Sequence, residues 1–355
     1  MRVVAEVDTE RESVASPETR EMLTVMLETV HGPLLARSLQ TAIQLGFFEA
    51  LAGGGRTANE VALQCETNPR TTAALLEVLA TTEYVSSTGD RYALTDLGRR
   101  WALGYRQGTV LSYFLMGVLE WRWYGHFATF LRTGEAVDMH AHLTPDEWRI
   151  YMDAMYVARK ATAETIIPAI PVPEGACRLL DLGGGHGFQA IALCRLHPNL
   201  QAVVFDLPGA IDGSATWFDL ESRGLEGRIS RQAGNALTDD FGDSEYDFIL
   251  VDGVVHVLSE AHNQLLVQRC ARALRPGGSL MLLDQLAQDH PGFDGQNNGF
   301  YHLLMTLICE SGFWTLERMA QWQRTAGLEP TRSFRILGLT GAALARKPFA
   351  ERPAE

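Results

Sequence analysis

The sequence contains few cysteines: five among 355 residues, with no C-x-x-C pair. They are scattered along the chain, at Cys65, Cys177, Cys194, Cys270 and Cys309. This distribution argues against a disulfide framework and against a zinc site, and it is typical of reduced thiols inside the cell. We therefore expect a cytoplasmic protein with no metal site.

Basic side chains and long apolar runs are also scarce. The chain has 30 Lys and Arg against 43 Asp and Glu, a formal net charge of −13. Because nucleic-acid binding depends on cationic contacts to phosphate, we expect no nucleic-acid partner. The longest apolar run, residues 110–119, falls short of the ~20 residues that span a bilayer, so no membrane partner is expected. Residues 1–20 lack the apolar core of a signal peptide and should form a poorly ordered tail.

The most informative stretch is residues 178–208, RLLDLGGGHGFQAIALCRLHPNLQAVVFDLP. It contains a short apolar strand that ends at Asp181, a glycine turn, a helix that stops before Pro198, and a second apolar strand. Together they predict one βαβ unit. The second strand delivers Asp206 to its carboxyl end, which is where open α/β sheets bind their ligands.

Glycine spacing narrows the choice of ligand. The dinucleotide fingerprint is G-x-G-x-x-G, whereas Gly183, Gly185 and Gly187 form G-x-G-x-G, and Phe188 stands where the last glycine belongs. A pyrophosphate is therefore disfavoured, but the Asp206 carboxylate can still accept hydrogen bonds from both hydroxyls of a ribose. A nucleoside without a pyrophosphate indicates S-adenosylmethionine. A glycine-rich turn in an unrelated α/β protein is the alternative.

The N-terminal region has the pattern of a small helical module with a hairpin. Apolar residues at helical spacing predict two helices between residues 22 and 52, separated at Gly32-Pro33. A capping box follows at residues 57–60, a helix that begins with Asn-Pro at 68–84, and a hairpin at 84–94. Helices followed by a hairpin predict a winged helix. The would-be recognition helix carries a single basic residue, Arg70, so we favour a dimerisation module over DNA binding.

Downstream of the βαβ unit, apolar runs and helical patterns predict the rest of the sheet. Strands are expected at 229–233, 246–251 and 279–284, and a closing hairpin at 331–336 and 342–346. A helix should begin at Val254 and run to Leu274, stopped by Pro276-Gly277-Gly278, with further helices at 300–309 and 316–326.

The motifs DLGGGHG and FDLP resemble the first two motifs of class I S-adenosylmethionine-dependent methyltransferases, in particular the dimeric small-molecule O-methyltransferases of plants and bacteria. The resemblance implies a Rossmann-like α/β sheet with helices on both faces, S-adenosyl-L-methionine as cofactor, and a homodimer. The implied domains are a mostly α winged-helix dimerisation domain at 21–110, an aromatic-rich helical connector at 111–170, and a cofactor-binding domain at 171–355.

The resemblance also implies site residues. The cofactor would contact Asp181, Gly183, Gly184, Gly185, Asp206, Leu207, Gly234, Asn235, Ala236, Asp252 and Gly253. The acceptor would contact Tyr151, Met155, Phe300, Leu303 and Met305. Asn235 stands where the family usually has an aspartate, but its amide can still pair with adenine.

The catalytic residues implied by the resemblance are His256 and Asp284. His256 falls on the position of the family's catalytic histidine, and a neutral imidazole is suited to removing a hydroxyl proton near pH 7. Asp284 falls on an acid that orients this histidine. The chain departs from the family pattern in having His-Val-Leu for His-Asp-Trp and Phe313 for a second orienting acid.

A pair of histidines, His140 and His142, stands in the loop sequence MHAHL. No cysteine or matched carboxylate spacing accompanies them, so we interpret them as solvated or substrate-lining side chains and not as metal ligands.

The whole sequence thus predicts an S-adenosylmethionine-dependent O-methyltransferase that acts on a small acceptor, aromatic or polyketide-like. Two alternatives stay open. One is a relative that uses the cofactor without consuming it, in a cyclisation or rearrangement. The other is a ligand-sensing winged-helix regulator.

Overall fold

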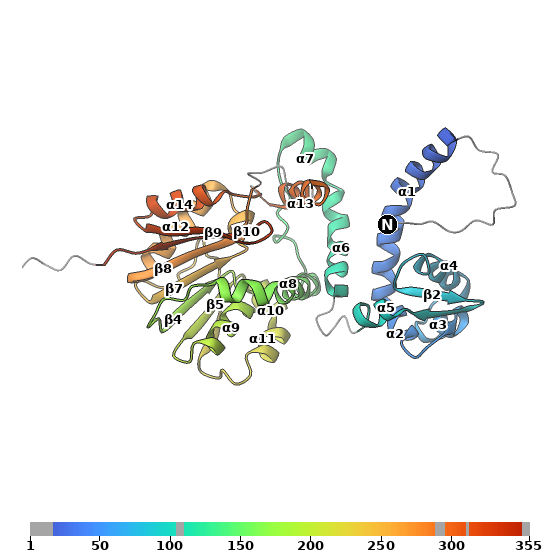
Figure 1. Ribbon diagram of the computed structural model, residues 1–355, viewed down its shortest axis with the longest axis horizontal. Helices are drawn as coiled ribbons and strands as arrows, with labels where there is room; N and C mark the ends of the chain where they lie inside the picture. The colour runs from blue at the N-terminus through green and yellow to red at the C-terminus, as the bar shows by residue number, and fades with distance from the viewer. Residues whose placement is uncertain (1–16, 104–109, 288–294, 310–311, 350–355) are drawn as a thin grey trace, which may run out of the picture. The chain divides into compact units, whose positions relative to one another are not determined.

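The computed structural model describes residues 17–103, 110–287, 295–309 and 312–349. The chain divides into two compact units, Met1–Leu119 and Glu120–Glu355, which we call the N-terminal and C-terminal units (Figure 1). The tail predicted at residues 1–20 lies mostly outside the described residues. In the parts of the chain that are described, no helix is long and apolar enough to cross a membrane.

The N-terminal unit contains helices of very different lengths and a three-stranded antiparallel sheet of order β1-β3-β2. Its elements are α1 (Pro17–Gln44), α2 (Phe47–Leu51), β1 (Arg56–Thr57), α3 (Ala58–Gln64), α4 (Pro69–Leu79), β2 (Val85–Thr88), β3 (Arg91–Leu94) and α5 (Asp96–Trp101). The expected capping box is confirmed, because the Thr57 side chain accepts from the Glu60 N–H and the Glu60 carboxylate accepts from the Thr57 N–H. This order of elements supports the winged-helix prediction.

The break predicted at Gly32-Pro33 is wrong. Pro33 lies inside α1, which runs without interruption over 28 residues. An interior proline removes one backbone hydrogen bond, but Gly32 and Pro33 are exposed, so no packing contact adds to that cost. The chain turns instead at Gly46, which has a left-handed φ of 78° that glycine adopts without strain.

The C-terminal unit is built on a seven-stranded sheet of order β6-β5-β4-β7-β8-β10-β9 (Figure 1). Its strands are β4 (Arg178–Leu182), β5 (Gln201–Asp206), β6 (Ile229–Ala233), β7 (Tyr246–Asp252), β8 (Leu274–Gln285), β9 (Glu329–Leu337) and β10 (Thr340–Arg346). The first five are parallel, whereas β10 pairs antiparallel with both β8 and β9. The predicted βαβ unit and closing hairpin are therefore confirmed.

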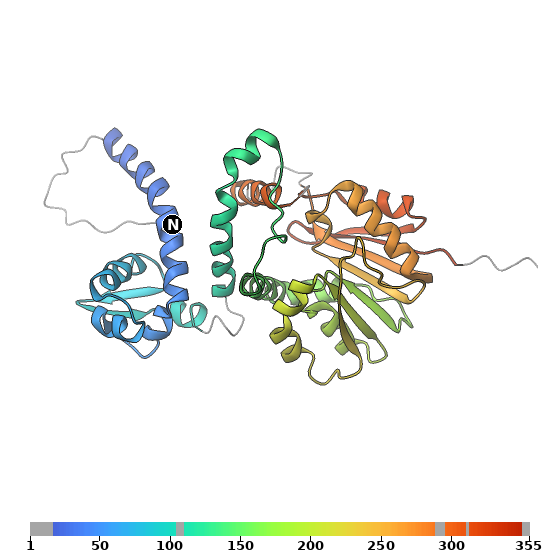
Figure 2. The ribbon, with the colours of Figure 1, turned by 180° about the vertical axis from the view of Figure 1, so that it is seen from behind.

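Helices cover both faces of this sheet, as Figure 1 and Figure 2 show. After α5, the described α-helices are α6 (Val110–Tyr124), which spans the boundary between the two units, α7 (Phe127–Thr133), α8 (Pro145–Ile166), α9 (Phe188–Leu196), α10 (Pro208–Gly213), α11 (Ala215–Glu221), α12 (Glu260–Ala273), α13 (Gly295–Ile308) and α14 (Leu316–Thr325), and of these α9 packs on one face of the sheet and α12 and α14 on the other. Because strand side chains alternate, Leu180 packs into the core that contains α12 and α14, and Leu179 into the core that contains α9. The doubly covered α/β sheet is thus confirmed.

The helix predicted from Val254 to Leu274 is interrupted. Val255–Val257 form a separate 3-10 turn, η3, and α12 begins only at Glu260, where the Ser259 side chain accepts from the His262 N–H. The Pro276-Gly277-Gly278 sequence lies inside β8 and does not stop the helix, which ends at Ala273. The wrong helix start at Val254 arose because Ser259 was not recognised as an N-cap. As a result, His256 lies on its own turn.

Candidate active site

The glycine turn lies between β4 and α9. Gly183, Gly185 and Gly187 all have positive φ, at 75°, 49° and 70°. A Cβ at Gly183 would lie 2.2 Å from Val254 Cγ2, and one at Gly185 would lie 2.5 Å from Met152 Cε. Conformation and space therefore both require glycine here, and α8 and the segment after β7 approach the turn closely.

Asp206 ends β5 and is hydrogen-bonded to the glycine turn. Its Oδ2 accepts from the Gly185 N–H at 2.8 Å, and its Oδ1 accepts from the Leu207 N–H at 2.7 Å. Burial raises the pKa of Asp206 to about 6, although both backbone hydrogen bonds oppose that change. The carboxylate is thus fixed in position, and each oxygen keeps a lone pair for another donor.

Carboxylates stand on four neighbouring strands at the same edge of the sheet. From β5 through β4 and β7 to β8 they are Asp206, Asp181, Asp252 and Asp284. Burial, followed by the charge of Asp252, raises the pKa of Asp181 to about 7. Burial also raises the pKa of Asp252 to about 6. A row of buried acids favours a cation, because each deprotonated carboxylate is stabilised by nearby positive charge.

The carboxyl ends of these strands, which we call the cofactor edge, fit S-adenosylmethionine, which carries a sulfonium and an ammonium group. Asp181 Oδ2 is buried and has no hydrogen-bond partner among the residues described. Beside the glycine turn, Asp206 offers the acceptor oxygens that a ribose diol requires. The residues present therefore match the charge and the polar groups of the cofactor.

The turn after β6 contains the three predicted adenine-side residues. Gly234 N–H donates to the Asp206 carbonyl at 2.9 Å, so this turn adjoins the end of β5. Asn235 Oδ1 accepts from the Leu237 N–H at 2.9 Å, which shapes the turn and orients the amide. Ala236 follows, half-buried. The adenine contact of Asn235 stays a prediction.

Arg159 on α8 was not predicted as a site residue. Its Nη2 lies 2.8 Å from Asp252 Oδ1, and Gln189 also donates to Asp252. The residue after this acid, Gly253, has a φ of 70°, and a Cβ there would lie 2.3 Å from Arg159 Nη2. Nothing in the local sequence around Arg159 indicates this ion pair, because its partner is distant along the chain.

His256 and Asp284 form the pair that the sequence predicted. His256 Nδ1 lies 2.8 Å from Asp284 Oδ1, and the His256 backbone N–H donates to Asp284 Oδ2 at 3.1 Å. The Asp284 side chain is 1% exposed, whereas that of His256 is 15% exposed. The buried Asp284 carboxylate thus hydrogen-bonds both the ring and the backbone of His256, while the His256 side chain stays partly exposed.

The turn that carries His256 is held by two side chains that sequence reasoning missed. Asn263 Nδ2 and Trp314 Nε1 both donate to the Val255 carbonyl, each at 2.9 Å. Phe313, which replaces the family's second acid, places its ring centroid 6.3 Å from that of His256. An apolar ring therefore stands beside the imidazole, and Asp284 alone of the described carboxylates hydrogen-bonds it.

The predicted acceptor residues are spread over two helices. On α8, Tyr151 packs with Trp148, and the Met155 backbone lies beside the ring of His186 in the glycine turn. Met152, not predicted, is the methionine that contacts the turn. On α13, Met305 is buried, whereas Phe300 and Leu303 are 76% and 40% exposed. The structure places Tyr151 near the cofactor edge and leaves the roles of Phe300 and Leu303 as predictions.

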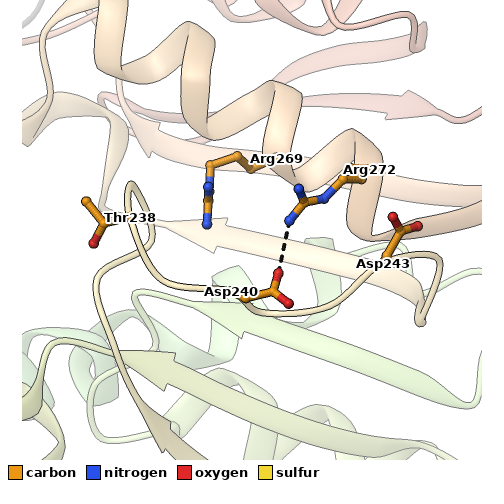
Figure 3. Close-up of a pocket in the computed structure, with 5 residues that line it drawn as sticks. All are labelled: Thr238, Asp240, Asp243, Arg269 and Arg272. Carbon is orange, nitrogen blue, oxygen red and sulfur yellow. Dashed lines mark hydrogen bonds and ion pairs between the residues drawn. The ribbon is translucent and has the colours of Figure 1, made fainter.

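A separate cavity of about 410 Å³ lies between α12 and the loop that precedes β7 (Figure 3). It is lined by Thr238, Asp240, Asp243, Arg269 and Arg272. Arg272 pairs with Asp240 at 2.9 Å, and the Arg269 guanidinium lies over the Phe241 ring. The two arginines and two aspartates that line the cavity balance in charge, and none of the predicted site residues lines it.

Comparison with known proteins places this site in a family. Residues 131–324 match the O-methyltransferase domain, and residues 27–103 match the O-methyltransferase dimerisation domain. 3-Hydroxy-5-methyl-1-naphthoate 3-O-methyltransferase of Streptomyces sahachiroi is 26% identical, over 88% of this chain and 91% of that protein. The N,N-dimethyltransferase OxyT of Streptomyces rimosus is 28% identical, over 70% of this chain and 74% of that protein.

Human N-acetylserotonin methyltransferase, solved in complex with S-adenosylmethionine, has the same fold, with a TM-score of 0.76 at 21% identity. The likeness covers 95% of this chain and 100% of that one. The domain match at 131–324 spans more than half of the sequence. The chain therefore belongs to the O-methyltransferase family and is an S-adenosylmethionine-dependent methyltransferase.

Proposed function

We propose that the enzyme methylates a hydroxyl group of a small aromatic or polyketide-like acceptor, with His256 as general base. The observation that carries the proposal is the 2.8 Å contact between His256 Nδ1 and Asp284 Oδ1, beside the row of carboxylates at the cofactor edge. An imidazole held in this way is suited to proton removal near neutral pH.

Each residue of the pair has a distinct task. The Asp284 carboxylate accepts the Nδ1–H of His256, which leaves the Nε2 lone pair to take the hydroxyl proton of the acceptor. When the imidazole becomes charged, the buried carboxylate stabilises it. When bound, S-adenosylmethionine supplies an activated methyl group, so the protein mainly positions the acceptor oxygen and removes its proton.

The aromatic class of the acceptor follows from the surroundings of the site. Trp148 and Tyr151 on α8 and Phe313 beside His256 offer flat apolar surfaces, which favour a flat ring. The naphthoate substrate named for the Streptomyces sahachiroi relative supports the same class. The name of OxyT, an N,N-dimethyltransferase, supports an amino group as the second candidate for the methylated group.

Incubation with methyl-labelled S-adenosylmethionine and matched phenols and arylamines tests the proposal. We expect label in the phenol products, with one demethylated cofactor formed for each methyl group transferred. Label only in the arylamines would move the assignment to N-methylation. Recovery of unconsumed cofactor beside a transformed acceptor would favour the cyclisation or rearrangement alternative.

Replacing Asp206 with Ala should weaken binding of S-adenosylhomocysteine about 5- to 150-fold, because roughly 1–3 kcal/mol is lost with hydrogen bonds to a charged acceptor. The pKa of Asp206 is raised to about 6, so the carboxylate is charged above that pH and neutral below it. Wild-type affinity should therefore fall between pH 8 and pH 5. Isothermal titration calorimetry measures both effects.

Two variants control this experiment. Asp206→Asn cannot ionise, so its affinity should be low at pH 8 and should fall less between pH 8 and pH 5 than that of the wild type. Asp219→Ala changes an exposed acid on α11 and should bind like the wild type. Unchanged affinity in Asp206→Ala would contradict the placement of the ribose.

We also propose that the enzyme works as a homodimer joined through its dimerisation domain. Within α1, Val30 and Leu34 are 63% and 58% exposed, one helical turn apart. Large apolar side chains exposed on one helix favour burial against another chain.

The double variant Val30→Asp with Leu34→Asp should shift the protein from dimer to monomer, because two charges would be buried without partners. Sedimentation-velocity ultracentrifugation over a range of concentrations measures this shift. Leu196→Asp, at a 62% exposed position at the end of α9 and outside the dimerisation domain, should leave the dimer intact. A double variant that sediments as the wild-type dimer would exclude this face of α1 from the interface.

A further inference from the structure

His140 is a conspicuous side chain that the proposed reaction does not use. It lies in the loop between α7 and α8. Asp138 Oδ1 accepts from the backbone N–H groups of His140 and Ala141, each at 3.1 Å. The Val137 N–H donates to the Leu307 carbonyl of α13 at 2.7 Å. These bonds fix the loop, and with it the position of the imidazole.

Aromatic side chains of α8 cover the His140 ring. It stacks on Trp148 with an interplanar angle of 4° and a centroid distance of 5.3 Å, and it meets Tyr151 edge-on at 5.3 Å. Trp148 packs in turn against Ala210 of α10 and against Leu207, which follows Asp206. His140 is therefore part of an aromatic cluster that adjoins the cofactor edge.

Neither ring nitrogen of His140 hydrogen-bonds any residue that the structure describes. Burial lowers the pKa of His140 to about 4, against the opposing effect of Asp138, and the charge of His256 lowers it further. At neutral pH the ring is uncharged, with one N–H donor and one acceptor nitrogen, and it lies within electrostatic range of His256.

An uncharged imidazole with covered faces and a free polar edge is suited to bind a polar group of a ligand. A metal is disfavoured, because no group of three or more His, Cys, Asp or Glu able to hold one occurs among the residues described. An anion is disfavoured by the negative charge of Asp138, which lies in the same loop and acts on the His140 ring. The ligand group should therefore be neutral, such as a hydroxyl or a carbonyl.

We propose that His140 is an acceptor-binding residue that hydrogen-bonds a second, uncharged polar group of an aromatic acceptor, adjacent to the hydroxyl that faces His256. The substrate class is then an ortho-dihydroxy or hydroxy-carbonyl aromatic compound. This inference rests on the proposed function, since it takes His256 to face the reacting hydroxyl.

The test compares two probes that differ in one hydroxyl, 2,3-dihydroxynaphthalene and 2-naphthol. Their dissociation constants are measured by calorimetry with saturating S-adenosylhomocysteine, so that binding is read without turnover. The wild type should prefer the dihydroxy probe by about tenfold, the value of one additional hydrogen bond. His140→Phe keeps an aromatic ring on Trp148 and should abolish that preference while binding 2-naphthol like the wild type.

Two further variants complete the experiment. His142→Phe, an exposed position in the same loop, should keep the preference. His140→Gln restores a donor and an acceptor and should recover part of it. A wild type without preference, or a preference that survives in His140→Phe, overturns the inference. An equal loss of affinity for both probes in His140→Phe would also overturn the inference, because it would indicate that His140 has only a packing role.

Methyl transfer to the same two probes is measured separately with labelled cofactor. A His140-dependent binding preference without any methylation would leave the His140 contact standing and would count against the proposed function. Methylation of both probes without a His140-dependent preference would support the proposed function and overturn the His140 contact.

Discussion

Replacing His256 with Ala should lower the turnover number for a phenolic acceptor by about 10²- to 10⁴-fold, the usual contribution of a positioned general base. Affinity for S-adenosylhomocysteine should stay unchanged, because Nδ1 is engaged by Asp284 and the free edge of the ring is assigned to the acceptor. Steady-state kinetics with saturating cofactor, together with calorimetry, separates the two effects.

Three comparisons sharpen this prediction. Asp284→Asn keeps the shape of the side chain but loses the charge that stabilises imidazolium, and it should cost less than His256→Ala. Added imidazole should restore part of the turnover in His256→Ala. His142→Ala removes an exposed histidine and should be neutral. Wild-type turnover in His256→Ala would show that proximity of the acceptor to the methyl group is sufficient.

Replacing Gly183 with Ala should reduce the free energy of unfolding by roughly 2–5 kcal/mol and abolish measurable cofactor binding. Left-handed backbone costs a non-glycine residue roughly 1–2 kcal/mol, and overpacking adds roughly 1–3 kcal/mol. Gly183 has a φ of 75°, and its Cβ would lie 2.2 Å from Val254 Cγ2. Because valine is β-branched and stiff, the clash should displace the turn. Urea denaturation and calorimetry measure both quantities.

Gly134→Ala is the matched control. Gly134 has a φ of 72° at the end of α7, and a Cβ there would meet nothing within 4 Å, so only the backbone strain of about 1–2 kcal/mol applies. Adding Val254→Ala to Gly183→Ala removes the clashing methyl groups and should recover the overpacking part. If Gly183→Ala destabilises no more than Gly134→Ala, the close approach of Val254 does not restrict the turn.

Local sequence patterns determined most elements of both units. Alternating and continuous apolar runs identified the strands, and Thr57 and Asn68 marked helix starts through their own side chains. The glycine turn and Asp206 were recognisable because they lie within one βαβ unit. The same reasoning failed at Pro33 and at Val254, where a local breaker and a missed cap gave the wrong helix limits.

Only the tertiary structure decided which of these residues meet. The order of the strands brings Asp206, Asp181, Asp252 and Asp284 to one edge, and packing of α8 adds Arg159 to Asp252. The stacking of His140 on Trp148 likewise depends on how a loop folds back onto a helix. Sequence periodicity indicates only how a residue is placed relative to residues a few positions away in the chain. Contacts between segments that lie far apart in the chain depend on the shape and packing of the whole core, which no local pattern contains.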